Sequence, residues 1–336
     1  MLGAVDQGLI YAVMALGVFL TFRILNFADL TVDGSFTAGT ATAAILIVDG
    51  YPPVLATVAG MLAGAVAGAL TGLLHTKAHI DPLLSSILVM LAMYTINTRI
   101  MWLGSGMQPT SMVPLLNIGT IFGNVAQGTW TSVGGIAVGV AVMVVVVNWF
   151  LRTKFGLAVM ATGDNPAMAA AMGINNDVTK IVTLAFSNGL VGLTGAVWAQ
   201  YTGSSSIGDG TGSILIGLAS VILGNAILGT RFLWLATIGV VVGSVLYRLA
   251  IFFALDWDFI QATDMKLISA VLVVIALVLS QAKGAHALVT KMTPWRAKAG
   301  VPEPMSVEPN QFSPFAEVDS AVNSASTGST AQAGRD

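Results

Sequence analysis

A short polar segment at residues 26–35 could carry chemistry, because it places carboxylates directly before an apolar run. It reads Asn-Phe-Ala-Asp-Leu-Thr-Val-Asp-Gly-Ser, and its candidate path residues are Asn26, Asp29, Asp33, Gly34 and Ser35. Asp33 or Ser35 can cap the free N–H groups at a helix start, and Gly34 permits a turn. The same residues can instead belong to a discontinuous helix that lines a solvated path, because polar backbone at membrane depth is tolerated only inside protein or facing water. The sequence leaves both interpretations open.

A second segment, residues 206–213, repeats the pattern of an Asp-Gly pair followed by Ser or Thr and then an apolar run. Its candidate path residues are Asp209 and Gly210. If the two segments enter the membrane from opposite faces, they match a pseudo-symmetric inverted repeat. Asn188 lies in the middle of another apolar run, where a buried amide needs a partner. A hydrogen bond between helices and a contact with solute both fit this residue.

A third segment, residues 152–180, predicts a short helix outside the membrane. Asn165 is typical of an N-cap, Pro166 of the first helical position, and Gly173 of a left-handed C-terminal cap. Alanines and methionines lie between them and would give the helix an apolar surface. Because such a short helix is marginal alone in water, its surface favours docking against another protein in the helix-in-groove manner. An ordinary loop helix without a partner also fits.

The composition places these segments among membrane helices. Of the 336 residues, 55% are hydrophobic and 9% are charged, and the mean hydropathy is +0.84. A soluble chain carries about 25% charged residues, so this chain lacks the charges that a water-facing surface needs. The formal net charge of −2 argues against nucleic-acid binding, which requires clustered Lys and Arg. The chain has no cysteine, and its 3 histidines show no ligand spacing with carboxylates, so no metal site is expected.

The predicted fold is all-α, a polytopic transmembrane bundle of roughly nine spans that are each about 20 residues long, with a discontinuous second span. The spans are expected near residues 4–22, 31–48, 53–74, 83–102, 131–151, 180–200, 212–229, 232–253 and 266–282. Most Lys and Arg of the short loops then fall on one side, which the positive-inside rule assigns to the cytoplasm. The N-terminus is expected outside and the C-terminus inside. Arg99 and Arg248 fall near span ends, where long side chains can snorkel to the interface.

Glycines spaced four residues apart in the third span predict close helix packing. They are Gly60, Gly64, Gly68 and Gly72. Such a row leaves a smooth face that another helix can approach closely, and Gly189, Gly192 and Gly195 in the sixth span are expected to act in the same way. Seams of this kind occur in carriers, channels and membrane enzymes alike, so they indicate packing rather than function.

The third segment also has the form of a known family's loop. It contains Phe155-Gly156, then residues 161–165 as Ala-Thr-Gly-Asp-Asn, an Ala-rich helix, and residues 173–175 as Gly-Ile-Asn. This order resembles the coupling loop of permease subunits of ABC importers of the branched-chain amino acid and ribose type. Residues 23–28 are similar to a stretch of the amino-acid permeases, and residues 28–35 to one of the sugar permeases with Asp33 intervening. The resemblance covers about residues 5–283 and is nearest to a subgroup linked to aromatic amino acids.

The resemblance implies a permease domain over residues 1–283, with a coupling loop at residues 152–180. The composition predicts that the remaining segment, residues 284–336, is a cytoplasmic tail that is disordered after about residue 300. In the family, the coupling loop docks into a groove on a separate cytoplasmic ATPase. The candidate docking residues are Phe155, Gly156, Ala161, Gly163, Asp164, Asn165, Pro166, Met168, Met172, Gly173, Ile174 and Asn175.

The resemblance also implies the remaining partners and the location. They are a second permease copy in a homodimer, an extracytoplasmic solute-binding protein, membrane lipid, and the bacterial inner membrane. ATP and Mg would bind the ATPase, so this chain is expected to hold no cofactor and to catalyse no reaction, and it contains no phosphate-loop motif. The expected function is a translocation path for a small solute such as an amino acid.

Two other function classes need features that the sequence lacks. An ion-coupled secondary carrier requires ionisable residues near the bilayer centre, and the central thirds of the spans are almost free of charge. A membrane-embedded enzyme should show a polar constellation such as His with Asp or Glu on adjacent helices, and no such pattern is found.

Overall fold

The computed structural model describes residues 1–104, 110–115, 119–123, 128–228, 232–255, 270, 271, 273 and 274. These residues belong to one compact unit, residues 1–283. The expected ninth span at residues 266–282 lies almost wholly outside the described residues, and the expected tail at residues 284–336 lies entirely outside them.

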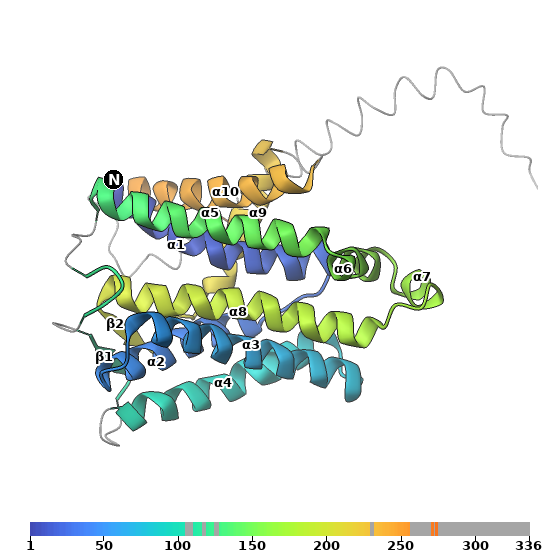
Figure 1. Ribbon diagram of the computed structural model, residues 1–336, viewed down its shortest axis with the longest axis horizontal. Coiled ribbons are helices and arrows are strands. Elements are labelled where there is room, and N and C mark those ends of the chain that lie inside the picture. Colours follow the sequence, from blue (N-terminus) through green and yellow to red (C-terminus); the bar gives the residue numbers. More distant parts are fainter. Residues whose placement is uncertain are drawn as a thin grey trace, which may run out of the picture. The chain divides into compact units, whose positions relative to one another are not determined.

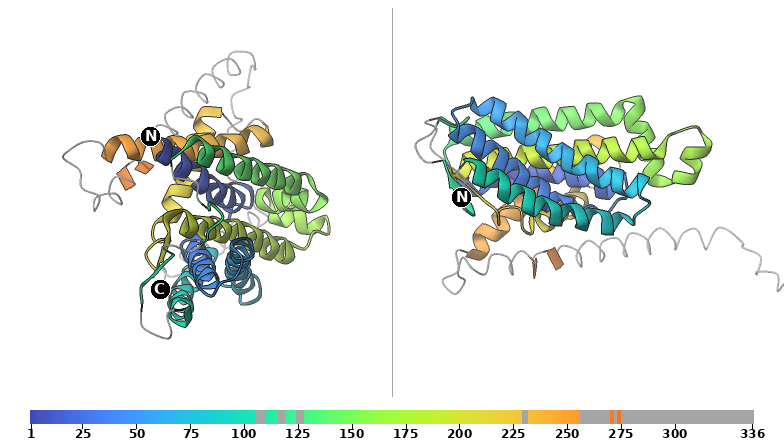
Figure 2. Two further views of the ribbon diagram at one scale, coloured as in Figure 1. Left: turned by 60° about the vertical axis from the view of Figure 1, so that its left-hand side comes forward. Right: turned by 90° about the horizontal axis from the view of Figure 1, so that it is seen from below.

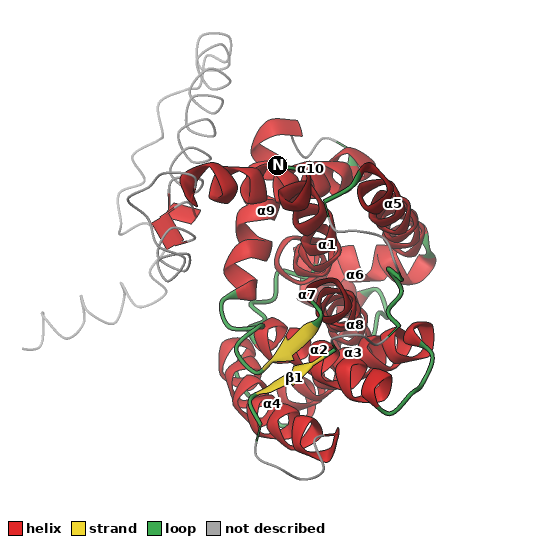
Figure 3. Ribbon diagram, turned by 90° about the vertical axis from the view of Figure 1, so that its left-hand side faces the viewer, coloured by secondary structure: helices red, strands yellow, loops and turns green. Residues whose placement is uncertain are grey.

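Long helices that run side by side form most of this unit (Figures 1 and 2). In chain order they are α1 (Leu2–Val18), the π-helix η1 (Phe19–Ile24), α2 (Thr31–Val48), α3 (Pro53–Lys77), α4 (Pro82–Gly104), α5 (Trp130–Arg152), α6 (Lys154–Asp164), α7 (Pro166–Ala171), α8 (Asn176–Thr202), α9 (Ser213–Leu228) and α10 (Leu233–Leu255). Two short strands, β1 (Met112–Pro114) and β2 (Ser204–Ser206), pair in antiparallel fashion at one end of the bundle (Figure 3). This small sheet is a departure from the all-α expectation.

The polytopic membrane fold is confirmed. Within the described residues, 7 helices are long and apolar enough to cross a membrane, counting α1 with η1 as one. They correspond to seven of the expected spans, whereas α9, at the position of another expected span, has only 16 residues. The full count of nine spans therefore stays a prediction.

The helices differ in how much of their surface is buried by protein. α1, α2 and α8 form the centre of the bundle, with Leu16 and Phe36 fully buried. By contrast, α5 exposes apolar side chains along its length, and Val138 and Val145 are each 67% exposed. A large exposed apolar face marks a contact with lipid or with another protein.

The glycine row of α3 packs against α8. A Cβ atom on Gly60 would lie 2.8 Å from the Ala196 Cβ, and one on Gly72 would lie 2.8 Å from the Ile181 Cα. Gly64 and Gly68 contact the backbone of α8 even more closely, at Asn188 and Leu184.

In α8, Gly192 faces Gly60 and Gly64, and Gly195 faces Phe36 of α2. Gly189 differs, because a Cβ there would make only an ordinary contact of 3.4 Å. The close approach of α3 and α8 thus depends on the α3 row and Gly192.

The expected discontinuity inside the second span is wrong, because α2 is continuous from Thr31 to Val48. Gly34 lies within this helix rather than at a turn. The irregular backbone lies just before α2, at residues 25–30, where Asn26 has φ +54°. An Asn tolerates this left-handed conformation better than most residues, and the exposed Asn26 therefore serves the turn between η1 and α2.

Candidate functional sites: a coupling segment and a helix junction

The coupling segment, residues 152–180, begins with a sharp turn from α5 into α6. The Thr153 Oγ1 accepts a hydrogen bond from the Gly156 N at 3.1 Å and so caps α6. Gly156 lies directly against the Phe150 carbonyl oxygen, and a Cβ would collide with it. The glycine of the Phe-Gly pair is therefore needed by the turn itself.

The short helix α7 has the caps that its sequence predicts. The Asn165 Oδ1 accepts from the Met168 N at 3.0 Å, Pro166 opens the helix, and Gly173 follows it with φ +84°. The Ile174 N donates to the Ala169 O at 3.0 Å, which closes the C-terminal turn. Asn175 then caps the next helix, α8, rather than belonging to α7.

Asn176 fixes α7 to its neighbours, a role that sequence reasoning missed. Its Nδ2 donates to the Pro166 O at 2.7 Å, and its Oδ1 accepts from the Thr162 Oγ1 of α6 at 3.2 Å. One amide thereby joins α6, α7 and the start of α8. An Asn at a helix start gives no sequence signal for such a bridge, because the partners are set by the fold.

The exposed surface of the coupling segment comes mainly from α7. Met168 is 62% exposed and Met172 is 70% exposed, while Ala169 is buried. The other exposed candidate residues are Asp164, Asn165, Pro166, Gly173 and Asn175. The remaining candidates, Phe155, Gly156, Ala161, Gly163 and Ile174, are buried or half-buried and position that surface.

Gly163 connects the coupling segment to the first span. A Cβ on this residue would collide with the Ile24 carbonyl oxygen at the end of η1. The helix α6 therefore rests directly on the π-helical end of the first span, where only a glycine fits.

Asp29, rather than Asp33 or Ser35, binds a free N–H group at the start of α2. It is fully buried, its Oδ1 accepts from the Thr31 N at 2.9 Å, and its Oδ2 accepts from the Asn188 Nδ2 at 2.6 Å. Asn188 therefore makes a hydrogen bond that joins α8 to the start of α2. Its Oδ1 has no hydrogen-bond partner among the described residues.

Asp33 caps a different helix, α9. Its Oδ1 accepts from the Ser213 Oγ and the Ile214 N, and its Oδ2 accepts from the Gly212 N, each at 2.9 Å. Gly210 lies directly against the Asp33 carbonyl oxygen. The two polar segments of the sequence thus meet at one place, which we call the α2–α9 junction: Asp33 with residues 210–214.

The α2–α9 junction lies deep within the bundle. Asp33 follows Asp29 by four residues, and Asp29 is hydrogen-bonded to Asn188 of α8. Asn188 lies about 18 Å along α8 from the first residue of that helix, at a rise of 1.5 Å per residue. α1 and α8 run antiparallel, since Gly17 contacts Ser187 while Tyr11 contacts Trp198. Residues 25–30 follow η1, which continues α1, and residues 203–212 follow the C-terminal end of α8. The two segments therefore approach the junction from opposite ends of the bundle.

A small cavity of about 170 Å³ adjoins the junction. Its lining includes Asp33, Gly34, Tyr94, Asn97 and Thr211. Asn97 of α4, which sequence reasoning missed, is fully buried and donates from its Nδ2 to the Gly34 O at 3.0 Å. Its Oδ1 accepts no hydrogen bond from the part of the chain that is described, and the same holds for the buried hydroxyl of Ser35.

Asp209 lies on the loop that leads into the junction. It is half-buried, and its Oδ2 accepts from the Ser206 N at 2.7 Å. Burial raises the pKa of the Asp209 carboxyl above its usual range, and the hydrogen bond from Ser206 opposes this only in part.

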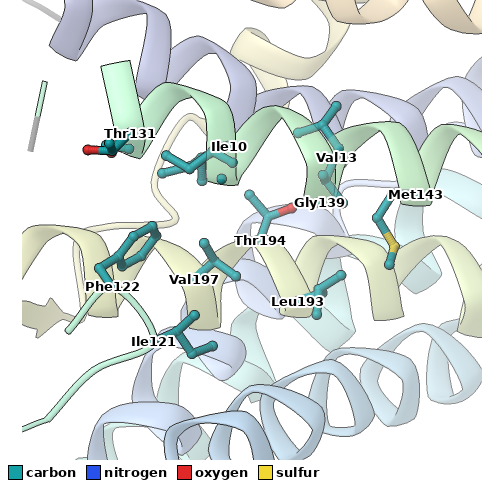
Figure 4. Close-up of a pocket in the computed structure, with 14 residues that line it drawn as sticks. Ile10, Val13, Ile121, Phe122, Thr131, Gly139, Met143, Leu193, Thr194 and Val197 are labelled. Carbon is teal, nitrogen blue, oxygen red and sulfur yellow. The ribbon is translucent and has the colours of Figure 1, made fainter. Parts of the chain in front are cut away.

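A larger cavity of about 390 Å³ lies between α1, α5 and α8 (Figure 4). Ile10, Val13, Leu193 and Val197 line it with mainly apolar atoms, and Thr194 adds a hydroxyl. No charged side chain among the described residues lines it, so none of these residues would orient a charged solute there.

The expectation that Arg248 snorkels to the membrane surface is wrong. Its side chain is only 6% exposed, and its guanidinium lies over the ring of Tyr11 with 4.1 Å between the Cζ and the ring centroid. Helical periodicity could not reveal this, because it does not say which neighbours face a given residue.

Comparisons with known proteins find relatives among membrane permeases. The sequence matches the family described as branched-chain amino acid transport system / permease component over residues 1–279. It is 36% identical over 273 residues to the tyrosine transport system permease protein of Clostridioides difficile (strain R20291), covering 81% of this chain and 88% of that protein. It is 31% identical over 214 residues to the ribose import permease protein of Bacillus subtilis (strain 168), covering 62% and 63%. No solved structure matches the chain.

Proposed function

The chain belongs to the family of permease components of branched-chain amino acid transport systems, and on that premise we propose that its translocation path runs through the α2–α9 junction. It is a multi-pass inner-membrane protein and the permease subunit of an ABC importer. It is not an enzyme, since ATP is hydrolysed by a separate ATPase subunit. A solute-binding protein is the other partner that the family implies.

The main support for the proposed path is that α2 and α9 both begin inside the bundle. Their N-terminal ends are joined through Asp33, which binds residues 212–214. Helix N-termini within a membrane bear partial positive charge and point at anionic groups in many transporters. Asp29 lies at the start of α2 and Asp33 at the start of α9, and irregular backbone at this depth is tolerated only inside protein or facing water.

The same arrangement supports a pseudo-symmetric inverted repeat. Segments 25–30 and 203–212 approach the junction from opposite ends, and each leads into a helix that starts there. Rocking one half against the other around such a centre would open it to each side in turn.

For the solute, we propose an amino acid with an aromatic side chain. The support is the 36% identity, over most of both chains, to a permease of a tyrosine transport system. The mainly apolar cavity of about 390 Å³ between α1, α5 and α8 would suit such a side chain as it passes.

For the coupling, we propose that the exposed surface of α7 docks on the ATPase, with Met168 and Met172 as its apolar anchors. Flexible methionines suit a surface that must stay bound while its partner moves. The end of the bundle with α6 and α7 (Figure 1) then faces the cytoplasm together with the C-terminus. A second permease copy completes the assembly, and lipid covers the apolar face of α5.

The test is ATP-driven uptake in proteoliposomes that contain the permease, its ATPase and its binding protein. Met172→Glu places a charge on the proposed docking surface, and it should abolish uptake and release the ATPase from the membrane. Met112→Glu is the matched control, because Met112 is also exposed, at 51%, but lies in β1 at the other end of the bundle. Equal uptake by Met172→Glu and wild type would refute the docking surface.

A further inference from the structure

Arg248 of α10 is a cation that lies buried within a membrane-spanning helix. It is 6% exposed, and no Asp or Glu among the described residues forms an ion pair with it. Its Nε has no hydrogen-bond acceptor in the described part of the chain. Withdrawing an arginine from water without pairing it is costly, and ionisable residues in membrane helices mark the paths of solutes and ions.

Aromatic rings surround the guanidinium. The Arg248 Cζ lies 4.1 Å from the Tyr11 ring centroid and 5.8 Å from that of Trp198. Tyr11 in turn stacks on Phe36 at 5.7 Å and meets Trp198 edge to face at 5.0 Å. The rings hold the guanidinium in place by cation–π attraction, yet they offer no hydrogen-bond acceptor comparable to a carboxylate.

The position of this group suits a solute on its way to the α2–α9 junction. Arg248 packs beside Gly8 of α1. The nearby Asp6 of α1 accepts a hydrogen bond from Tyr201, which lies three residues before β2. A cation and aromatic rings thus lie around Tyr11 of α1, and they suit the carboxylate and the ring of an aromatic amino acid.

We propose that Arg248 binds the carboxylate of the transported solute, between the end of the bundle with β1 and β2 and the α2–α9 junction. The planar guanidinium matches a carboxylate with two parallel hydrogen bonds, which Lys cannot make. This inference rests on the proposed function, because it assumes that the solute passes through this chain.

The first experiment measures binding to the purified permease–ATPase complex without the solute-binding protein. The probes are L-phenylalanine, 3-phenylpropionate, which keeps the carboxylate, and phenethylamine, which lacks it. Millimolar concentrations of the first two should raise the thermal unfolding midpoint of the wild type, and phenethylamine should not. Arg248→Met should lose both shifts. Absence of any shift in the wild type, or equal shifts in Arg248→Met, would overturn the proposal.

The second experiment separates a binding role from a structural one. Because Arg248→Met removes an unpaired buried charge, its ligand-free complex should unfold no earlier than the wild type, with an intact ATPase rate. Its uptake should fall by about tenfold or more, since a charge-assisted pair is lost, and Arg248→Lys should fall less. Arg99→Met is the matched control, because Arg99 lies exposed on α4. An early-unfolding Arg248→Met complex would assign Arg248 a structural role and contradict the proposal.

The outcomes distinguish a failure of the inference about Arg248 from a failure of the proposed importer function. If the wild-type complex imports solute with ATP and Arg248→Met imports it equally well, the inference about Arg248 fails while the importer function stands. If the wild-type complex does not import any amino acid with ATP, the proposed function itself fails.

Discussion

Replacing Gly163 by alanine should uncouple ATP hydrolysis from transport. Gly163 lies in α6, and a Cβ there would collide with the Ile24 carbonyl oxygen and lie 3.1 Å from the Leu25 carbonyl carbon. These are backbone atoms, which cannot move aside as a flexible side chain can. The substitution must therefore displace α6 from η1 at the contact that joins the coupling segment to the first span.

The size of the effect follows from two opposing contributions. Alanine favours a helix over glycine by about 1 kcal/mol, whereas forcing an added methyl group into a packed contact costs about 1 to 3 kcal/mol. The net cost against the docked arrangement is therefore up to about 2 kcal/mol, which corresponds to a change of up to roughly 30-fold in its population. The complex should still assemble and hydrolyse ATP, but import less solute per ATP.

The assay is the ratio of solute imported to ATP hydrolysed in proteoliposomes. Gly134→Ala in α5 is the matched control, because a Cβ there would meet nothing within 4 Å. It has the same gain in helix propensity without the collision, and its ratio should equal that of the wild type. An unchanged ratio in Gly163→Ala would refute the idea that this contact transmits motion.

Three further predictions concern caps and charge. Asp33→Ala removes the acceptor of three hydrogen bonds at the start of α9 and should lower stability by about 3 kcal/mol; an unchanged unfolding midpoint in detergent would count against the junction. Asn165→Ala should weaken ATPase binding because it loses the α7 cap, worth about 1 kcal/mol, while Asn165→Asp keeps the cap and should bind as wild type does; equal binding by the two variants would show that the cap is not needed. Burial raises the pKa of Asp209, so the folded state holds this proton more tightly than the unfolded state, and stability should fall as the pH rises above the ordinary value of 3.8 toward the folded pKa. Asp209→Asn should make the unfolding midpoint less dependent on pH in that range, and an identical pH profile would contradict the assignment.

Local signals in the sequence predicted most of the helices and the caps of α7. Apolar runs long enough to span a membrane are read directly from the chain, and the Asn165, Pro166 and Gly173 pattern depends only on near neighbours. These features need no knowledge of tertiary contacts, which is why they could be placed by residue number.

The α2–α9 junction was recognised only as two similar segments. One of the two interpretations left open had Asp33 or Ser35 as a cap of their own helix, whereas Asp33 binds residues about 180 positions further along the chain. A carboxylate that precedes an apolar run suits either role, because a cap needs only free N–H groups nearby and not a particular sequence distance. The assignment therefore had to come from the fold.

Arg248 was assigned to the wrong environment for a related reason. Its position near a span end favoured snorkelling, and the rings that enclose it come from α1 and α8, at Tyr11 and Trp198. The sequence held one unused signal, a cation within a span that contains no acidic residue.

Uptake into proteoliposomes under two energy sources tests the central claim most directly. The vesicles contain this chain, its ATPase and its solute-binding protein, and they receive either ATP with Mg²⁺ or a proton or sodium gradient. The importer assignment predicts accumulation of solute with ATP alone and none with either ion gradient. Accumulation driven by an ion gradient in the absence of ATP would contradict it.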